Sequence, residues 1–588
     1  MKISEFATFL EEIDKRSGRI EITQLLTEMF RRAQKNEVKP ISYMLLGKVA
    51  PDFEGLELGL GDKMIMKAIA LATGASLEKV KELYDSLGDL GLVAEKLREK
   101  RAATLLDFTT TKTQERDVVS VFNELLKIAN TSGEGAQDTK IKLLAKLISE
   151  LNGAEVRYVV RMASGDIRIG VADQTIIDAL AAAFSANEEL VERAYNITSD
   201  LGFVAEVLAI SGEEGLKQIK VQPGRPLKPM LAERAQSLQE IFEKMGGKAA
   251  FEYKYDGERV QAHKYDSRVE LFSRRIERIT SHYPDVVEAL LKGISAQSFI
   301  VEGEIVAVEP ETGEMMPFQE LMHRRRKYDV EEALQKYPAK TMLFDVLYVD
   351  GVDYTSKPYL ERRKKLEEIV QESDSLALST MMITQEVGEA QRFFDEAISA
   401  GCEGIMAKTL DPAVGYRAGN RGWAWIKYKR DYKSELTDTL DLVVVGGFYG
   451  RGKRAGKIGG YLLAAYNPSN GSFDTVCKVA TGFSDEDLVE IPKMLEQYRI
   501  PQKHPSVNSK LNADVWYKPV VVMEIVGAEL TLSPTHTAAF SKIREGSGLA
   551  VRFPRFTGRI RSDKSATEAT TVDELVEMYK SQLKKVQE

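Results

Sequence analysis

The stretch Glu252-Tyr253-Lys254-Tyr255-Asp256-Gly257-Glu258-Arg259 decides how the fold of the chain is interpreted. Its Asp-Gly pair predicts a tight turn directly after a short strand that carries Glu252 and Lys254 on one face. The ordinary interpretation of Lys254 is a surface lysine before a turn, and the functional one is a nucleophile. A protonated lysine cannot attack, so burial or nearby positive charge would have to favour the neutral amine. A metal ion or arginines such as Arg259 and Arg274 could supply that charge.

Further polar strings follow this stretch in order, and each has an ordinary explanation when it is taken singly. Phe344 would be a core residue, Glu302 and Glu304 would form the exposed face of an edge strand, and Cys402 would be a small buried side chain. The order of the whole series argues against chance. The strings are Ser273-Arg274-Arg275, Val301-Glu302-Gly303-Glu304-Ile305-Val306, Leu343-Phe344-Asp345-Val346, Glu403-Gly404-Ile405-Met406-Ala407-Lys408, Gly419-Asn420-Arg421-Gly422-Trp423, Trp425-Ile426-Lys427-Tyr428-Lys429, Arg552-Phe553-Pro554-Arg555-Phe556 and Arg559-Ile560-Arg561-Ser562-Asp563-Lys564.

The chain before this series is expected to be helical. Residues 77–87, 118–128 and 141–151 repeat apolar positions at helical spacing, and Asn152-Gly153 is the stop expected of a helix C-cap. We therefore predict an all-α domain over residues 1–218.

An extended connector is expected next, because three prolines lie within Val221-Gln222-Pro223-Gly224-Arg225-Pro226-Leu227-Lys228-Pro229 and cannot sit inside a helix. Residues 299–308 and 341–349 are predicted strands, the second followed by an Asp350-Gly351 turn, and residues 361–371 are a predicted helix. This mixture indicates an α+β domain at residues 219–432.

The last part of the chain is rich in short β-like runs among glycine-rich turns. They cover residues 440–448, 461–466 and 520–526 and fit a small β-barrel or sandwich at residues 433–588. A chain of 588 residues allows three or four domains at about 150 residues each, and the patterns indicate three.

The overall composition is that of an ordinary globular protein, with 43% hydrophobic and 29% charged residues. The 81 Lys and Arg against 89 Asp and Glu give a net charge of −8, which excludes a uniformly basic nucleic-acid binder. Positive charge is nevertheless concentrated in residues 324–327, 421–433, 451–457 and 542–564. A single such run is usually solvated surface, but four of them with Gly, Tyr and Trp interleaved favour a phosphate-rich partner.

Two cysteines exclude a disulfide framework and a four-cysteine zinc site, and five histidines make a His-rich metal site unexpected. The first residues contain no signal-peptide pattern, and no apolar stretch approaches 18 residues. We expect a cytoplasmic protein that acts away from membranes.

The ordered strings resemble the nucleotidyltransferase motifs of ATP-dependent DNA ligases, specifically the archaeal and eukaryotic replicative group. The resemblance covers the whole chain, with secondary support from Arg168-Ile169-Gly170-Val171 and from Phe448-Tyr449-Gly450-Arg451-Gly452-Lys453-Arg454. It implies an all-α DNA-binding domain, an α+β adenylation (nucleotidyltransferase) domain and a β-barrel OB-fold domain, in that order. One departure is the pair Thr557-Gly558, which stands where a single residue is expected.

The same resemblance implies roles for individual residues. Lys254 would become covalently adenylated, Glu252 would recognise the adenine edge, Phe344 would stack on the base and Glu304 would hold the ribose. The residues that would contact the ribose and phosphates are Arg259, Arg274, Arg421 and Lys427. A divalent metal would be organised by Glu403, with Glu304 and Asp256 as helpers. Lys429 would face the transferred phosphate, and the leaving pyrophosphate would be oriented, when the OB-fold closes, by Arg559, Arg561 and Lys564.

The implied cofactors are ATP and Mg2+ or another divalent cation. The implied partners are nicked double-stranded DNA and a sliding clamp, and the chain is expected to act as a monomer in replication, repair and recombination. The clamp-docking motif is not clear from the sequence, and the stretch around residues 101–108 is a weak candidate.

Several alternatives remain to be separated. An RNA ligase or an mRNA capping enzyme shares lysine nucleotidylation but does not require the long helical domain or the closing Arg/Lys string. A non-catalytic DNA-binding or clamp-loading scaffold would have no need of Lys254, Glu304 and Glu403 in this order. An NAD-dependent ligase is excluded because its zinc module needs four cysteines and this chain has two. A Walker-type ATPase is excluded as well, because residues 447–453 resemble a Walker loop but are followed by Arg454 where that loop needs Ser or Thr.

Overall fold

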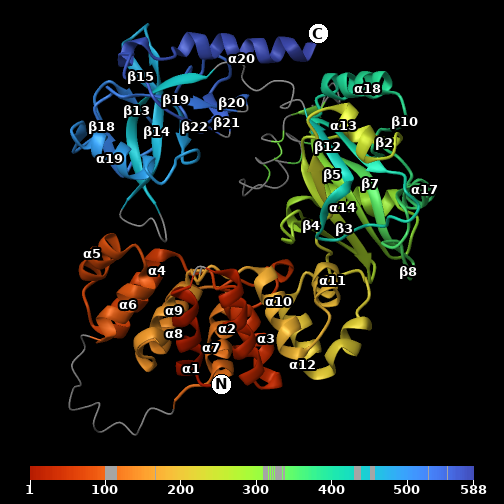
Figure 1. The fold of residues 1–588 in the computed structure, drawn as a ribbon, viewed down its shortest axis with the longest axis horizontal. Helices are drawn as coiled ribbons and strands as arrows, with labels where there is room; N and C mark the ends of the chain where they lie inside the picture. The colour runs from red at the N-terminus through yellow and green to blue at the C-terminus, as the bar shows by residue number, and fades with distance from the viewer. Residues whose placement is uncertain are drawn as a thin grey trace. The chain divides into compact units, whose positions relative to one another are not determined.

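The computed structural model describes the chain except for residues 17, 100–114, 166, 309–314, 317, 319–320, 322–323, 325–333, 335–337, 430–438, 451–456, 528, 553 and 588. The chain divides into two compact units, residues 1–428 and 429–588, whose elements are drawn in Figure 1. The domain limits that we predict after residues 218 and 432 stay predictions. The second limit and the stretch 101–108 fall outside the described residues.

The described elements of residues 1–217 are helices, as predicted. Their inward faces share one apolar core, to which α1, α3, α9 and α10 each contribute fully buried residues. The helices are α1 (Ile3–Asp14), α2 (Arg19–Arg32), α3 (Lys35–Met44), the short 3-10 helix η1 (Asp52–Glu54), α4 (Asp62–Thr73), α5 (Leu77–Leu87), α6 (Leu90–Glu99), α7 (Val118–Asn130), α8 (Ala136–Glu150), α9 (Gly153–Ala163), α10 (Asp173–Phe184), α11 (Glu188–Thr198) and α12 (Leu201–Lys217).

Side-chain caps set where several of these helices begin. The Asp117 carboxylate accepts the Ser120 N–H at the start of α7, and Ser76 accepts the Lys79 N–H at the start of α5. We predict that Asn152-Gly153 ends the preceding helix as its C-cap, and this prediction is wrong. Asn152 forms a capping box with Glu155 and so starts α9, while α8 ends at Glu150.

The connector is extended, as its prolines predict, and its backbone is bonded to strand side chains. The Gly224 N–H donates to Nδ1 of His263 at 3.0 Å, and the Leu227 N–H donates to Oε1 of Gln261 at 2.8 Å. Burial lowers the pKa of His263 to about 3, which keeps this ring neutral and able to accept. The connector is therefore fixed to the same strand that carries Arg259.

The remainder of the first unit contains two sheets with helices around them. One has the strand order β1-β12-β11-β2-β10, and the other has the order β4-β3-β5-β7-β8 with β6 on β5 and β9 on β7. The elements are β1 (Leu231–Arg234), α13 (Leu238–Lys244), β2 (Ala249–Lys254), β3 (Glu258–Tyr265), β4 (Arg268–Ser273), the 3-10 helix η2 (Thr280–His282), α14 (Pro284–Gly293), β5 (Phe299–Val308), β6 (Met315–Met316), β7 (Ala339–Val349), β8 (Val352–Asp353), α17 (Tyr359–Ile369), β9 (Leu376–Leu378), β10 (Met381–Thr384), α18 (Val387–Ser399), β11 (Gly404–Thr409) and β12 (Arg421–Lys429).

The predicted strands and helix of this region are confirmed. β5 has the predicted bounds, and the turn after β7 has φ of 45° at Asp350 and 91° at Gly351, the left-handed values that favour an Asp-Gly pair. The edge-strand alternative for Glu302 and Glu304 is wrong, because β5 lies between β3 and β7. A central strand turns its polar residues toward other protein groups.

The described part of the second unit is a β region with two α-helices, as the short β-rich runs predict. Its eight-stranded sheet follows the order β16-β18-β13-β14-β15-β17, with β19 on β13 and β22 on β19. The elements are β13 (Leu440–Tyr449), β14 (Ile458–Asn467), β15 (Ser472–Val479), α19 (Asp487–Glu496), β16 (Arg499–Ile500), β17 (Val507–Asn508), β18 (Val515–Tyr517), β19 (Val522–Val526), β20 (Glu529–Ser533), β21 (Gly548–Arg552), β22 (Arg555–Ile560), the 3-10 helix η5 (Ala566–Glu568) and α20 (Val572–Gln587).

The departure at Thr557-Gly558 has a structural explanation. In the pairing of β22 with β19, Phe556 lies opposite Ile525 and Ile560 lies opposite Met523, so β22 contains extra residues. A bulge absorbs them, and Gly558 supplies the φ of 90° found there.

Among the described residues, no helix is long and apolar enough to cross a membrane. Cys402 and Cys477 are both free and buried.

Candidate active site

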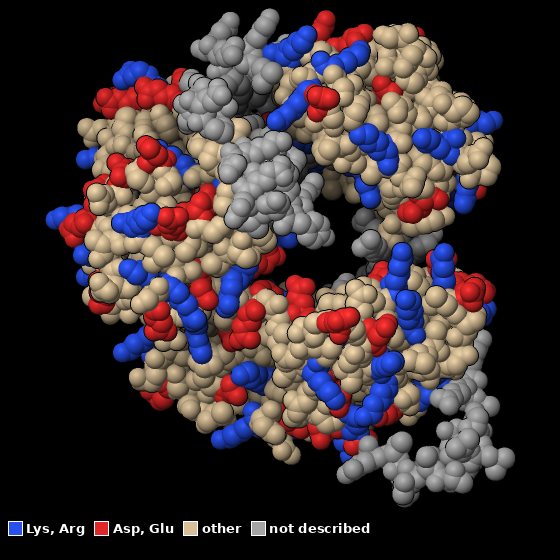
Figure 2. All heavy atoms as spheres, turned by 180° about the vertical axis from the view of Figure 1, so that it is seen from behind, with Lys and Arg blue, Asp and Glu red and all other residues tan. Residues whose placement is uncertain are grey.

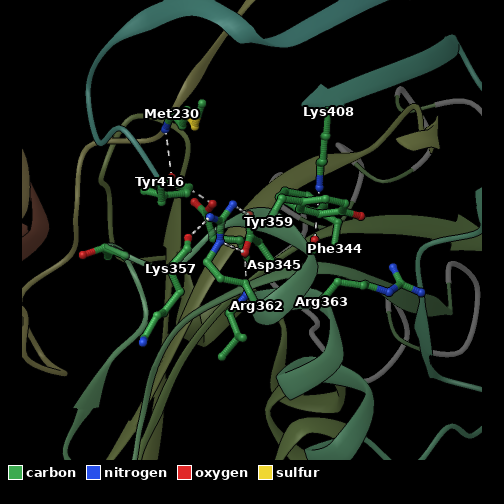
Figure 3. A network of polar contacts seen from close by, with 12 residues as sticks. Met230, Phe344, Asp345, Lys357, Tyr359, Arg362, Arg363, Lys408 and Tyr416 are labelled. Carbon is green, nitrogen blue, oxygen red and sulfur yellow. Dashed lines mark hydrogen bonds and ion pairs between the residues drawn. The ribbon is translucent and has the colours of Figure 1, made fainter. Parts of the chain in front are cut away.

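The predicted site residues of the first unit come from two sheets. In the pairing of β2 with β11, Lys254 lies opposite Gly404 and Glu252 lies opposite Met406, so these side chains share a face with Lys408. In the other sheet, Arg259 on β3 lies opposite Glu304 on β5. Contacts of Lys408 with Phe344 on β7 join the two sheets (Figure 3).

Lys254 is paired with Glu403. Its Nζ lies 2.6 Å from Oε2 of Glu403, and the Glu403 N–H donates to the Lys254 carbonyl at 2.8 Å. The side chains are 22% and 19% exposed, so the pair is accessible from solution while most of it is covered. The amine must lose a proton and leave this ion pair before its lone pair can attack an electrophile.

Glu252 is buried and surrounded by donors. The Tyr359 hydroxyl donates to its Oε1, Nζ of Lys408 lies 2.8 Å from its Oε2, and the Arg363 guanidinium lies 3.6 Å away. Burying a carboxylate without such partners would cost several kcal/mol, so the donors explain how the side chain can be 2% exposed. They also fix its orientation.

Phe344 owes its position to a β-bulge. Glu302 on β5 pairs with Asp345 on β7, the next residue Gly303 pairs with Leu343, and Phe344 is the extra residue between them. A bulge re-aims a side chain, and this ring meets Trp425 edge-on with centroids 6.0 Å apart. It remains half-buried, as a ring that stacks on a ligand must be.

Arg259 is held in a polar network behind these rings. It donates to Glu302 Oε2 at 3.0 Å and to the Met230 carbonyl at 3.0 Å, and its guanidinium lies 5.4 Å from the ring centroids of both Phe344 and Trp425. Its Nε is buried without a hydrogen-bond acceptor among the described residues. Most of the guanidinium is thus occupied within the protein.

Glu304 lies in an environment that opposes its charge. Burial raises the pKa of its carboxyl to about 7, with Glu403 and Asp256 acting in the same direction and Lys254 and Arg259 against it. A carboxyl group in this state gains from new hydrogen-bond donors, such as the hydroxyls of a ribose. This is the kind of perturbation that often marks a functional site.

Arg274 lies near the same carboxylates, and Arg421 lies near Arg274. Burial, followed by the neighbouring Arg259 and Arg421, lowers the pKa of Arg274, an effect that Glu304 and Glu403 oppose. Lys427 is half-buried on β12, on the same face as Trp425. The structure therefore brings Arg274 and Arg421 to the site, where the converging positive charge suits phosphates.

A divalent metal fits this site only together with a ligand. Within the described residues, no group of three or more His, Cys, Asp or Glu side chains is arranged to hold an ion. Mg2+ is commonly held by one or two carboxylates plus substrate phosphates and waters. Glu403 can supply such a carboxylate, and Glu304 lies near enough to both Glu403 and Asp256 to interact with them electrostatically.

The basic residues predicted for pyrophosphate belong to the second unit and are engaged there in ion pairs. Arg561 lies 2.9 Å and Lys564 2.6 Å from Oδ2 of Asp441, and Arg559 lies 3.7 Å from Glu524. Asp441 on β13 lies directly opposite Glu524 on β19, so their two negative charges repel each other. The basic side chains offset this repulsion.

The basic segments of the sequence are only partly described. Arg324 is buried in a bidentate pair with Asp285 and is not a surface group, while the rest of residues 324–327 and Arg451 to Arg454 lie outside the described residues. On the face drawn in Figure 2, basic and acidic side chains are interspersed. The expected concentration of positive charge in these segments stays a prediction.

Sequence reasoning did not single out several residues that build the site. Lys408 ends one of the quoted strings, and Tyr359 and Arg363 begin α17, yet their convergence on Glu252 requires three elements from distant parts of the chain. Tyr416 was also missed, although its hydroxyl donates to Glu302 at 2.9 Å. A charged residue inside an apolar strand, as Lys408 is, was the one available signal.

Comparisons with known proteins agree along the chain. Residues 2–181 match the family described as DNA ligase N terminus, residues 229–429 match the ATP dependent DNA ligase domain, and residues 454–564 match the ATP dependent DNA ligase C terminal region. DNA ligase 2 of Thermofilum pendens is 52% identical over 587 residues, covering 99% of this chain and 98% of its relative. The DNA ligase of Saccharolobus solfataricus is 48% identical over 591 residues, covering 100% of this chain and 98% of its own length.

A solved structure described as Pmar-Lig_Pre. aligns with a TM-score of 0.55 at 17% identity and covers 95% of this chain and 99% of that one. This likeness concerns the fold alone.

Proposed function

The chain belongs to the ATP-dependent DNA ligase family, and from this premise we propose that it seals nicks between a 3′-OH and a 5′-phosphate in duplex DNA through a lysine–AMP intermediate. A phosphate monoester has no leaving group of its own, so the 5′-phosphate must first be activated. Transfer of AMP supplies that activation.

The reaction consists of three displacements at phosphorus. The neutral amine of Lys254 attacks the α-phosphorus of ATP, an N–P bond forms, and the bond to pyrophosphate breaks. An oxygen of the 5′-phosphate then attacks the lysine-bound AMP, and the amine leaves with a proton to give AMP–DNA. Finally the 3′-OH attacks the activated phosphate, loses its proton and releases AMP.

The nucleotide would be held between the two sheets of the first unit. Glu252 would accept from the base, Phe344 would stack on it, and Glu304 would bind the ribose. Each displacement spreads negative charge over phosphate oxygens, which favours cationic neighbours. The cationic groups assigned to this task are Arg259, Arg274, Arg421, Lys427 and Lys429.

Glu403 is the protein group proposed to hold a divalent cation, with Asp256 and Glu304 nearby. When bound, Mg2+ would neutralise part of the phosphate charge. The same carboxylate also forms an ion pair with Lys254, so Glu403 would serve both the metal and the nucleophile. Arg559, Arg561 and Lys564 would meet pyrophosphate in place of Asp441 and Glu524.

The other parts of the chain are proposed to bind the duplex. The helical residues 1–218 and an OB-fold at residues 433–588 would contact backbone phosphates with little sequence preference, leaving residues 219–432 as the adenylation domain. A monomer acting in the cytoplasm in replication, repair and recombination, with a sliding clamp as partner, completes the proposal.

The observation that carries this proposal is the Lys254–Glu403 pair at 2.6 Å on the sheet face that also carries Glu252. The test is a nicked duplex with a labelled 5′-phosphate, incubated with the protein, ATP and Mg2+. We expect joined strands and a transient AMP–DNA species, and neither should form with Lys254→Ala. An intact nick after prolonged incubation of wild-type protein would contradict the proposal.

The same assay separates the rival functions. An RNA ligase would join a nicked RNA substrate in preference to DNA, and a capping enzyme would take GTP and leave the nick open. A non-catalytic scaffold would bind the duplex and leave both ATP and the nick unchanged.

A further inference from the structure

Phe53, in the 3-10 helix η1, is a residue of the helical part of the chain that packs against a strand of the candidate active site. It is only 6% exposed, and its ring meets that of Phe272 on β4 edge-on, with centroids 6.4 Å apart. Ile276 is buried beside them, and the three side chains form a small apolar cluster of their own. This cluster lies within the compact unit that also contains Lys254.

The turn that follows β4 has an unusual backbone conformation at Ile276. The Ser273 N–H donates to the Glu277 carbonyl oxygen and the Ile276 N–H donates to that of Ser273, each at 2.9 Å. Ile276 has φ of 66°, in the left-handed region where a β-branched residue is an outlier. Such a conformation persists only where the surrounding structure imposes it. Burial of Ile276 in the cluster with Phe53 offsets its cost, so the shape of the turn depends on the helical part.

Arg274 lies in this turn, two residues after Phe272 and two before Ile276. Burial lowers the pKa of its guanidinium, and the charges of Glu304 and Glu403 oppose this lowering, so the group lies near the carboxylates of the nucleotide site. A guanidinium stabilises a phosphate through hydrogen bonds of fixed geometry. A displacement of about 1 Å, even one caused far from the chemistry, can slow a reaction by about 100-fold.

We propose that Phe53 is a positioning residue for adenylation: by holding the turn at residues 273–277 it aims Arg274 at the phosphates of ATP. The helical residues 1–217, whose proposed task is to bind the duplex, then also support the first chemical step, before DNA takes part. This inference rests on the proposed function, because Arg274 acts there on the nucleotide.

The test measures lysine–AMP formation from ATP and Mg2+ in the absence of DNA. Phe53→Ala removes the ring from the cluster and should lower kcat/KM about 10-fold, within the range that a small misplacement produces. Phe53→Leu keeps an apolar side chain in the cluster and should cause a smaller loss in the same direction. It takes the place of Phe53→Ala if that protein does not fold.

A double-mutant cycle separates positioning from a general loss of structure. Arg274→Ala removes the group that Phe53 is proposed to aim, so adding a Phe53 substitution to it should cause little further loss of kcat/KM. If Phe53 acted only by stabilising the fold, the two losses would multiply.

Phe122→Ala is the matched control. Phe122 on α7 is 8% exposed and stacks on Tyr43 of α3 with centroids 6.2 Å apart, and neither residue belongs to the cluster of Phe53. This variant removes a similar aromatic contact from the helical part and should leave DNA-independent lysine–AMP formation unchanged.

Three results would overturn the inference: Phe53 variants that form lysine–AMP at the wild-type rate, losses from Phe53 and Arg274 that multiply fully, or a loss in Phe122→Ala as large as that in Phe53→Ala. If wild-type protein forms no lysine–AMP at all, the proposed function itself fails and the inference falls with it. The two failures are thus distinguishable.

Discussion

Replacing Glu304 with Gln is expected to stabilise the first unit above neutral pH. Burial raises the pKa of Glu304 to about 7 from an ordinary value near 4.5, so the folded protein binds this proton more tightly than the unfolded chain does. The resulting cost to stability is absent below pH 4.5, grows between pH 4.5 and 7, and is constant above. A shift of about 2.5 units corresponds to about 3 kcal/mol.

Hydrogen exchange of peptides from β3, β5 and β7 is the suitable assay, because a chain with two compact units need not unfold in one step. Glu304→Gln should slow exchange in these strands at pH 8 and have little effect at pH 5. Glu361→Gln, on the exposed face of α17, is the control and should change neither. Equal exchange of wild type and Glu304→Gln at pH 8 would refute the reasoning. The same variant should form lysine–AMP less efficiently, since a site group commonly trades stability for function.

Three further predictions concern other parts of the molecule. Glu403→Gln should raise the Mg2+ concentration needed for half-maximal adenylation, because it removes the carboxylate beside Lys254, and an unchanged midpoint in a Mg2+ titration would contradict this. Asp345→Asn should destabilise β7 and α17 by about 3–5 kcal/mol in hydrogen exchange, because it leaves the buried Arg362, which Asp345 binds at 2.7 Å and 3.0 Å, without its counter-charge. A loss of stability below about 1 kcal/mol would contradict this prediction. Binding of a nicked duplex should weaken steeply between about 50 and 200 mM salt despite the net charge of −8, and a flat titration would be inconsistent with phosphate contacts.

The parts of the fold that follow from local chemistry could be predicted from the sequence. The helix over Leu77–Leu87 and the strand over Phe299–Val308 have the predicted bounds, because apolar spacing and turn residues act within a few positions. Asn152 shows the limit of this reasoning. The same Asn-Gly pair can end one helix or begin the next, and the capping box with Glu155 decides for the second.

The candidate site could be predicted only in part. Lys254 and Glu403 are 149 positions apart, and the resemblance indicated both, but their direct contact depends on the register of β2 with β11. The bulge that aims Phe344 has no sequence signal, since it arises from how β5 and β7 pair. The resemblance implies that Arg259 contacts the nucleotide. Its ion pair with Glu302 could not be predicted, because it depends on how β3 pairs with β5.

The most direct test of the account is the identity of the residue that receives AMP. The protein is incubated with α-labelled ATP and Mg2+, denatured, digested and examined for the labelled peptide. We predict a single labelled peptide that contains Lys254, with AMP on its Nζ, and no label on Lys254→Ala. Label on another residue, equal labelling of Lys254→Ala, or a wild-type chain that takes up no label would contradict the central claim.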